Sequence, residues 1–388
     1  MASSLALPSY SAAQSPATAA PYAGNFSAVQ QKMAELIQKK EIAGAVTIVV
    51  TPQQVLYLDA VGESNRETRT PMQTNTIFWI ASMTKPLAGL AICKLQEEGK
   101  LDLEDPVSKF IPEFKELKDK QGQPVNVTIK QLLNHTSGLQ EPKAEEVVDA
   151  RVLADLIPIY VSKPVNFKPG SEWRYSQASI NTAGRIVEIL TEKPFEEYLS
   201  EEFFQPLKMI NTTFYLSPEQ LQRLAIAYRR TDEGELEVEP KHRLLHGKKA
   251  EERDRPPYPN MGLFSTAPDY GRLCRMLLNE GELDGRRYLK PETVQLFRTI
   301  NTTDEHKTGF TPGNGWGVGT CVVREPQGIT ERLSPGTFGH GGAYGTQAWI
   351  DPERKIAWVL MVQRSNFANA DASDVRKAFQ DVIFPTAP

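Results

Sequence analysis

The sequence predicts an α+β fold: one antiparallel sheet flanked by terminal helices, with a mainly helical region inserted into it. Three observations predict this fold. β-branched runs separated by turns lie near both ends of the chain, at 44–61 and at 313–363. Helical patterns, prolines and loops fill the stretch between them, 101–304. Amphipathic segments precede the first β-branched run and follow the last one. Strands from the two ends can therefore share one sheet, with a binding site in the cleft between this sheet and the helical region.

The composition narrows the class of protein. The chain has 388 residues, 40% hydrophobic and 24% charged, which is the balance of a globular protein with a large core. Its net charge of −4 provides no basic face for a nucleic acid, so no nucleic-acid partner is expected. No stretch approaches about 18 uncharged apolar residues, so no transmembrane segment is predicted. Cys93, Cys274 and Cys321 lie far apart without CxxC spacing, which favours buried thiols over a disulfide framework or a zinc site, with a single bridge left open.

The predicted boundaries divide the chain into three parts. Residues 1–25 form a disordered leader, 26–100 together with 305–388 form an α/β sheet domain, and 101–304 form a helical domain with a long loop at 228–260. The leader is rich in Ala, Ser and Pro and lacks the basic region and long apolar stretch of a signal peptide. It could equally be the start of a processed mature chain. A periplasmic or secreted location and a cytoplasmic one therefore both stay open.

The first elements follow from hydrophobic periodicity. Residues 27–40 predict an amphipathic helix that Ser27 caps. Its apolar face consists of Val29, Met33, Leu36 and Ile37. The β-branched runs 44–50 and 55–61 flank the turn sequence TPQQ, which predicts a hairpin.

The helical part begins with a mostly apolar helix at 84–98. Pro86 is tolerable there because it falls in the first turn. Thr128 is placed to cap a short helix that follows it. Two more helices are predicted at 180–190 and 269–280.

The loop at 228–260 is charged, non-periodic and ends in prolines, so we expect it to be exposed, either lining a site or as a solvated excursion. It places His242 and His246 four residues apart, but no glutamate follows His242 as a zinc protease would require. No metal site and no cofactor are predicted. Short strands separated by Gly-rich turns then follow residue 313, and a helix at 373–383 closes the chain.

The chemistry of the sequence centres on Ser82 and Lys85. A serine hydroxyl is a poor nucleophile until a base removes its proton, and a lysine three residues later lies one helical turn away on the same face. Apolar neighbours disfavour the charged form of the lysine, and the positive end of the helix dipole acts in the same direction. The backbone N–H of Ser82 could supply half of an oxyanion hole. Taken alone, the pair has a structural alternative, in which Ser82 caps the helix and Lys85 extends outward.

Four further motifs accompany this pair along the chain. With "SMTK" at 82–85, they are "LLNHTSGL" at 132–139, "KPGSEWRYSQ" at 168–177, "GLFSTAPDY" at 262–270 and "GHGGAYGTQAWIDP" at 339–352. Their order resembles that of the penicillin-recognising serine enzymes, which include serine β-lactamases, penicillin-binding proteins and family VIII carboxylesterases. The class C β-lactamase branch and its esterase relatives are the most similar. The resemblance spans about residues 27 to 385 and implies a β-lactamase/transpeptidase-like fold.

The resemblance implies a role for Tyr175 in the family's Tyr-x-Asn motif. Tyr175 would act as a general base of the phenolate type, with its pKa held low by Lys85, and would later activate the deacylating water. The alternative is a core tyrosine beside Trp173. The third position of the motif differs, because Gln177 replaces the asparagine that helps to hold the acyl-amide chain of β-lactams in this family.

The family's Lys-Thr-Gly motif is replaced here by His340, Gly341 and Gly342. The lysine normally faces a carboxylate of the substrate, whereas a histidine with an ordinary pKa of about 6.5 is mostly neutral at pH 7. Simple esters lose nothing by this change, because they have no such carboxylate. By analogy, the N–H of Ala343 completes the oxyanion hole. A histidine in a Gly-rich strand turn is the structural alternative for His340.

These residues predict a serine hydrolase that cleaves carboxylic esters with short acyl chains through an acyl-enzyme on Ser82. A β-lactamase, a D-alanyl peptidase or an acyltransferase would use the same mechanism and remain alternatives. A non-catalytic relative that binds ligands or assembles with itself is a further alternative. The expected partner is a small-molecule ester or lactam, and the oligomeric state stays open.

Overall fold

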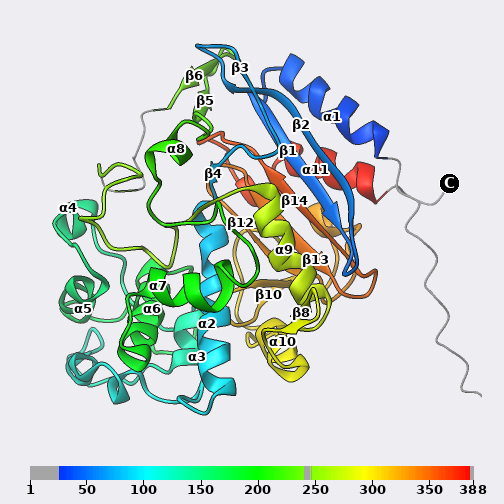
Figure 1. Ribbon diagram of the computed structural model, residues 1–388. Helices are drawn as coiled ribbons and strands as arrows, with labels where there is room; N and C mark the ends of the chain where they lie inside the picture. Colours follow the sequence, from blue (N-terminus) through cyan, green and yellow to red (C-terminus); the bar gives the residue numbers. More distant parts are fainter. Residues whose placement is uncertain (1–25, 240–244, 246, 385–388) are drawn as a thin grey trace, which may run out of the picture.

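The computed structural model describes residues 26–239, 245 and 247–384 (Figure 1). The predicted leader and the pair His242 and His246 lie outside these ranges.

One eight-stranded antiparallel sheet, built from both ends of the chain, forms the centre of the fold (Figure 1). The strand order is β10-β11-β12-β13-β14-β1-β2-β3. The bounds are β1 Gly44–Val50, β2 Val55–Asn65, β3 Thr70–Pro71, β10 Asn314–Trp316, β11 Cys321–Val323, β12 Phe338–Gly341, β13 Gln347–Asp351 and β14 Ile356–Met361. The predicted hairpin β1–β2 joins the last strand β14, with Val46 opposite Met361. This pairing confirms the predicted α+β fold.

Helices cover both faces of the sheet (Figure 1). α1 (Ser27–Gln38) and α11 (Asp374–Ile383) pack against each other on one face, and α9 (Ala267–Leu278) packs on β1, β13 and β14 on the other. Side chains of β14 alternate between these layers: Trp358 joins the cluster of α1 and α11, and Val359 joins the cluster of α9. A strand buried on both faces needs a largely apolar sequence, which β14 has throughout and β1 has except at Thr47.

Two details of the helices differ from the sequence-based expectations. Phe26, not Ser27, occupies the N-cap position of α1. α9 falls within the stretch 101–304 assigned to the helical domain, yet it packs on the sheet because its apolar face fits β1 and β14.

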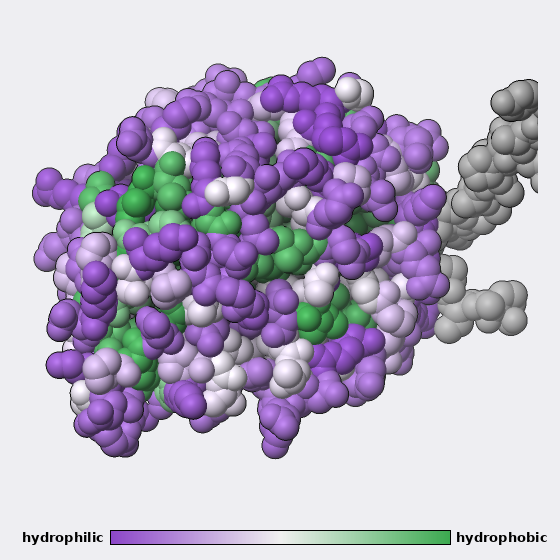
Figure 2. Space-filling model, turned by 90° about the horizontal axis from the view of Figure 1, so that it is seen from below, coloured by the Kyte–Doolittle hydropathy of each residue, from purple (hydrophilic) through white to green (hydrophobic). Residues whose placement is uncertain are grey.

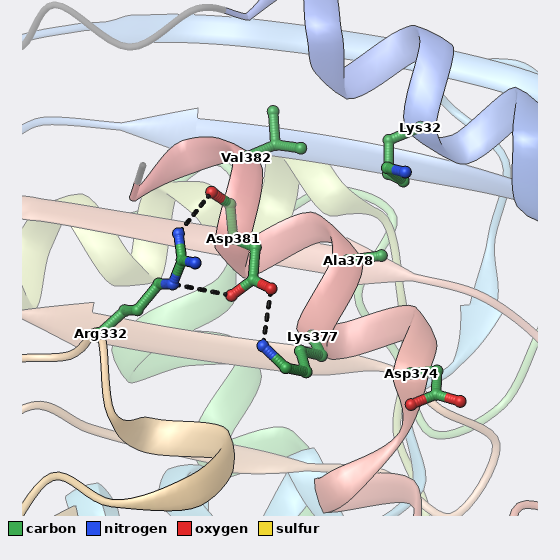
Figure 3. Close-up of a pocket in the computed structure, with 7 residues that line it drawn as sticks. All are labelled: Lys32, Arg332, Asp374, Lys377, Ala378, Asp381 and Val382. Carbon is green, nitrogen blue, oxygen red and sulfur yellow. Dashed lines mark hydrogen bonds and ion pairs between the residues drawn. The ribbon is translucent and has the colours of Figure 1, made fainter. Parts of the chain in front are cut away.

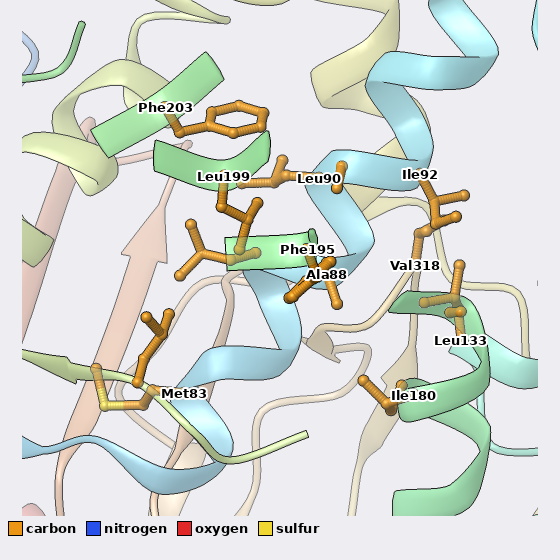
Figure 4. Close-up of a cluster of buried hydrophobic side chains, with 14 of the residues drawn as sticks. Met83, Ala88, Leu90, Ile92, Leu133, Ile180, Phe195, Leu199, Phe203 and Val318 are labelled. Atoms are coloured by element: carbon orange, nitrogen blue, oxygen red, sulfur yellow. The ribbon is translucent and has the colours of Figure 1, made fainter. Parts of the chain in front are cut away.

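The helical region surrounds α2 (Lys85–Glu97), which is buried almost all round (Figure 4). Its neighbours include α6 (Gln177–Thr191) and α10 (Pro291–Arg298). The shorter helices are α3 Ile129–Leu133, α4 Ala144–Val147, α5 Leu153–Val161, α7 Phe195–Leu199 and α8 Pro218–Leu221. Thr128 caps α3 as predicted, since its Oγ1 accepts the N–H of Gln131 at 3.3 Å. A helix that is apolar on every side belongs in a core, and α2 thereby fixes the position of Lys85.

The segment 228–260 is not simply the exposed loop that its charge suggested. It forms a hairpin of β5 (Tyr228–Arg230) and β6 (Leu236–Val238), and its last part is buried, with Arg255 and Asn260 each 1% exposed. Arg255 donates to the carbonyl of Phe214 at 2.6 Å. Arg255 can be buried because backbone carbonyls accept its hydrogen bonds, whereas Asn260 donates to the side-chain oxygen of Gln177.

The remaining short strands are β4 Phe78–Trp79, which pairs with β7 Phe264–Ser265, and the hairpin of β8 Glu282–Leu283 and β9 Arg286–Arg287. The three cysteines are buried free thiols, as predicted. Within the described residues, no helix combines the length and apolar character needed to cross a membrane. On the face shown in Figure 2, apolar side chains form separate patches among hydrophilic ones.

Candidate active site

Ser82 lies in a 3-10 turn, η1 (Ala81–Thr84), that leads directly into α2. Ala81 has a φ of 44°, in the left-handed region that costs a residue with a Cβ free energy. Two hydrogen bonds hold this conformation: the N–H of Ile80 donates to the carbonyl of Leu263 at 3.0 Å, and within the turn Thr84 Oγ1 donates to the carbonyl of Ala81 at 2.7 Å. The turn leaves Ser82 partly exposed and Lys85 fully buried.

Lys85 Nζ has three oxygen atoms within hydrogen-bonding distance. They are Ser82 Oγ at 3.1 Å, Gln177 Oε1 at 2.8 Å and the carbonyl oxygen of Asn260 at 2.8 Å. Two of these are carbonyl oxygens, which can only accept. A neutral amine has two hydrogens and one lone pair, so its hydrogens satisfy the two carbonyls and its lone pair faces Ser82. Ser82 can then donate its proton to Lys85.

The surroundings of Lys85 favour this neutral form. Burial lowers the pKa of Lys85 well below its usual value, and the more distant carboxylates of Glu141 and Asp371 oppose that shift only in part. The predicted activation of the lysine by its apolar surroundings agrees with this environment.

Tyr175 stands in an aromatic cluster beside Ser82. The distance from the centre of the Tyr175 ring to the centre of a neighbouring ring is 4.5 Å for His135, 6.3 Å for Trp173, 4.7 Å for Phe310 and 5.8 Å for Trp316. Lys85 Nζ lies 4.5 Å from the centre of the same ring. Desolvation in this cluster raises the pKa of Tyr175 well above 10, against the effect of a hydrogen bond with Ser82. The expected phenolate with a lowered pKa is therefore wrong for the resting site, because a neutral Lys85 supplies no charge to hold it.

His340, on β12, fixes the direction of the hydrogen bond of Tyr175. Its Nδ1 lies 2.6 Å from the carbonyl oxygen of Gly341, which can only accept, so Nδ1 carries the proton. Nε2 is then an acceptor and receives the hydroxyl proton of Tyr175 over 3.3 Å. Burial lowers the pKa of His340 to about 3, so the imidazole is neutral. This environment is consistent with the predicted neutral histidine at position 340.

A second buried imidazole, that of His135, lies behind Tyr175. Its Nδ1 accepts the N–H of Ser176 at 3.1 Å, and burial lowers its pKa well below the usual value. His135 therefore adds no charge to the cluster.

Gln177 contacts Lys85 through its side-chain carbonyl. Its Oε1 accepts from both Lys85 and Asn260 Nδ2, the latter at 2.9 Å. Asn260 and Glu141 were not predicted as site residues. Glu141 accepts the N–H of Gln177 at 2.6 Å, at the N-terminus of α6 where a carboxylate is stabilised. Neither residue belongs to a motif, and only the fold brings their distant segments to Lys85.

The two glycines after His340 allow close approaches that a Cβ would prevent. At Gly341 a Cβ would lie 1.9 Å from Asp371 Oδ1, and at Gly342 it would lie 2.5 Å from the carbonyl oxygen of Ile80. β12 can thus lie directly beside η1. Ala343 follows at the exposed end of this turn.

A cavity of about 560 Å³ opens onto these residues. Its lining comprises Ser82, Tyr175, Gln177, Phe310, His340, Gly341, Gly342, Ala343, Ser365, Phe367, Ala368, Asn369, Ala370 and Asp371. Every predicted site residue except the buried Lys85 therefore lines this one cavity. The described residues contain no group of three or more His, Cys, Asp or Glu side chains placed to bind a metal ion.

Another groove, between α1 and α11, lacks such chemistry (Figure 3). Three of its charged side chains pair within the groove, since Arg332 and Lys377 contact Asp381 at 3.1 Å and 2.7 Å. No serine, tyrosine or histidine lines it. The cavity at Ser82 is therefore the candidate active site.

Comparison with known proteins agrees with this geometry. A family model described as β-lactamase matches residues 29–382. Esterase EstB of Burkholderia gladioli is 30% identical over 361 residues, which cover 84% of this chain and 87% of that protein. Protein Rv1367c of Mycobacterium tuberculosis (strain ATCC 25618 / H37Rv) is 32% identical over 380 residues, covering 90% and 92%. The solved structure of EstCE1, described as a hydrolase with promiscuous acyltransferase activity, matches with a TM-score of 0.80 and 26% identity, covering 92% of this chain and 98% of that one.

Proposed function

The chain belongs to the β-lactamase family, and we propose that it is a serine carboxylesterase that forms an acyl-enzyme on Ser82. The observation that carries this proposal is the position of Lys85. Its buried amine lies 3.1 Å from Ser82 Oγ while two carbonyl oxygens occupy its hydrogens. An uncharged amine so placed is a general base for the serine hydroxyl.

In the proposed acylation, Ser82 Oγ attacks the ester carbonyl and its proton passes to Lys85 Nζ. The N–H groups of Ser82 and Ala343 would stabilise the oxyanion, since Ala343 lies in the same cavity and its N–H has no acceptor among the described residues. The new ammonium, 4.5 Å from the ring of Tyr175, would lower the pKa of the phenol. Tyr175 would then protonate the departing alkoxide and regain a proton from Lys85.

Deacylation would use the same groups in reverse. Lys85 and Tyr175 would remove a proton from a water molecule, which attacks the acyl-enzyme and releases the carboxylic acid and Ser82. His340 would hold the phenol of Tyr175 in place whenever the hydroxyl carries its proton, because its Nε2 can only accept.

The charges of the cavity favour esters over lactams. His340 is neutral, and neither a lysine nor an arginine is among the residues that line the cavity. A substrate carboxylate would therefore find no cation to replace its water. Similarity to the esterase EstB supports the same choice. We expect short acyl chains, because the cavity of about 560 Å³ must hold both halves of the ester.

The direct test is the Ser82→Ala variant with p-nitrophenyl acetate and p-nitrophenyl butyrate. The variant should lose turnover by at least about 1,000-fold, since a covalent step cannot proceed without its nucleophile. The exposed Ser171 provides a control, and Ser171→Ala should keep the wild-type rate. Equal rates for wild type and Ser82→Ala would overturn the proposal. Nitrocefin and a D-Ala-D-Ala peptide, assayed in parallel, separate the lactamase and peptidase alternatives.

Acyl transfer to an alcohol is the second candidate, and the similarity to EstCE1 favours it. Adding a primary alcohol to the ester assay should then yield a new ester as well as the acid. Product analysis that finds only the acid would exclude this activity under those conditions. A fluorophosphonate probe that fails to label Ser82 in the wild-type protein would favour the non-catalytic alternative.

A further inference from the structure

Asp371 is the acidic side chain that lines the cavity at Ser82. It lies in a short 3-10 turn, η7 (Ala370–Ala372), between β14 and α11. Its N–H donates to Asn369 Oδ1 at 3.0 Å, and its carbonyl accepts from Arg376 Nη1 at 2.7 Å. These bonds fix the backbone of Asp371, and the missing Cβ of Gly341 leaves room for its carboxylate beside β12.

Burial raises the pKa of the Asp371 carboxyl group, and Arg376 and Gln347 oppose that shift. Oδ1 accepts from Gln347 Nε2 at 3.3 Å, whereas Oδ2 makes no hydrogen bond within the described part of the chain. Arg376 is the neighbouring cation, but it binds the backbone carbonyl and does not form an ion pair with the carboxylate. Its guanidinium lies 4.1 Å from the ring centre of Trp349, behind the cavity. Neither a lysine nor an arginine is among the residues that line the cavity, so Arg376, which acts on Asp371 from outside the lining, balances this carboxylate only in part.

Aromatic rings complete this side of the cavity. Phe310 packs edge to face on Tyr175 at 4.7 Å, is 44% exposed, and its backbone carbonyl accepts from Asn369 Nδ2 at 2.7 Å. That bond ties the loop of Phe310 to the segment that carries Asp371. Phe367 lines the cavity as well. The guanidinium carbon of Arg364 lies 4.4 Å from the centre of the Phe367 ring, and Arg364 also forms an ion pair with Glu41 at 2.7 Å. Aromatic faces next to a carboxylate are a chemical environment that binds ammonium groups.

We propose that the preferred substrates of this enzyme are esters that bear a positively charged amine or quaternary ammonium group close to the scissile bond. Asp371 and the exposed ring of Phe310 would recognise that group. This inference rests on the proposed ester hydrolysis by Ser82 and adds the class of substrate.

The test compares esters that differ only in charge. Acetylcholine and 3,3-dimethylbutyl acetate have the same shape, with nitrogen replaced by carbon. For a charge in the acyl group, p-nitrophenyl 4-(trimethylammonio)butyrate is paired with p-nitrophenyl 5,5-dimethylhexanoate. Wild type should show a kcat/KM about tenfold higher for the charged member of at least one pair, as a cation held by a carboxylate and aromatic rings would give.

The ratio within a pair, measured for each variant, isolates recognition of the charge. Asp371→Asn should reduce the ratio to about 1. Asp374→Asn is the matched control, because Asp374 is exposed at the start of α11 and should leave the ratio unchanged. Phe310→Leu, at an exposed position, should lower the ratio about threefold, and it provides a second variant if Asp371→Asn does not fold.

Two results would overturn the inference while leaving the esterase intact. One is Ser82-dependent hydrolysis of the neutral esters with no preference for the charged member of either pair. The other is a preference that both Asp371→Asn and Phe310→Leu retain. If no ester is hydrolysed, or if Ser82→Ala hydrolyses them equally well, the proposed function itself fails and this inference falls with it.

Discussion

Replacing Lys85 by methionine tests whether the folded protein holds an uncharged lysine. Methionine has a similar length and no proton to exchange. The unfolded chain carries Lys85 with an ordinary pKa of about 10.4, whereas burial lowers the pKa in the folded protein. Between those two pKa values, unfolding takes up a proton. The wild-type protein should therefore gain stability as the pH rises through this window, and Lys85→Met should lack that gain.

The expected pH dependence of the free energy of unfolding follows from the full burial of Lys85. A difference of one bound proton changes the free energy of unfolding by between about 1 and 2 kcal/mol per pH unit. The substitution also leaves the carbonyl of Asn260 without its donor, which costs roughly 1 to 3 kcal/mol at every pH. The pH slope of the difference between wild type and variant is therefore the quantity to measure, because the pH-independent terms cancel from it.

Denaturant unfolding at pH 7, 8 and 9 provides the assay. Wild type should gain stability over Lys85→Met at each step, and the variant should lose kcat by about 100-fold to 10,000-fold. Lys115→Met is the control, because Lys115 is exposed and its removal should leave a difference that does not change with pH. A constant difference between wild type and Lys85→Met across this range would refute the neutral lysine and, with it, the general base.

Two other predictions follow from the neighbours of Lys85. Tyr175→Phe should lower kcat for p-nitrophenyl acetate by at least about 100-fold with little change in the melting temperature, because Ser82 and His340 are the hydrogen-bond partners of its hydroxyl among the described residues. A loss of kcat below threefold would remove Tyr175 from the proton path. In the folded protein His340 has a pKa of about 3 and stays neutral, whereas the unfolded chain binds a proton at this histidine below about pH 6.5. Wild type should therefore lose between about 1 and 2 kcal/mol of stability per pH unit relative to His340→Gln as the pH falls from 6.5 to 5, measured by the denaturant midpoint. Equal losses of stability in the two proteins would show that the imidazole is charged in the folded state.

The parts of this protein that the sequence predicted are those written into local patterns. Ser82 and Lys85 lie one turn apart, and a helix as apolar as α2 has to be buried, so the buried lysine follows from about 15 consecutive residues. The strands at both ends alternate or run apolar, which predicts one sheet. Tyr175 and His340 came from motif order, not from periodicity.

What the sequence could not provide is the set of groups that meet only after folding. Asn260 supplies a backbone carbonyl to Lys85, and any residue type has such a carbonyl, so no sequence signal marks it. Asp371 lies in a short turn that resembles any polar loop. The pKa of Tyr175 depends on how completely Trp316 and Phe310 exclude water from its ring, which is a property of packing.

The neutral state of the site and the replacement of the family's lysine by His340 support one another. A cation at position 340 would lie beside the hydroxyl of Tyr175 and would favour a phenolate, whose charge would in turn favour an ammonium at Lys85. The imidazole accepts the proton of Tyr175 instead, so the phenol, the amine and the imidazole can all remain uncharged in a desolvated cluster. Asp371 is then the charge that an incoming substrate meets, and this makes the charge of the substrate the property to vary first.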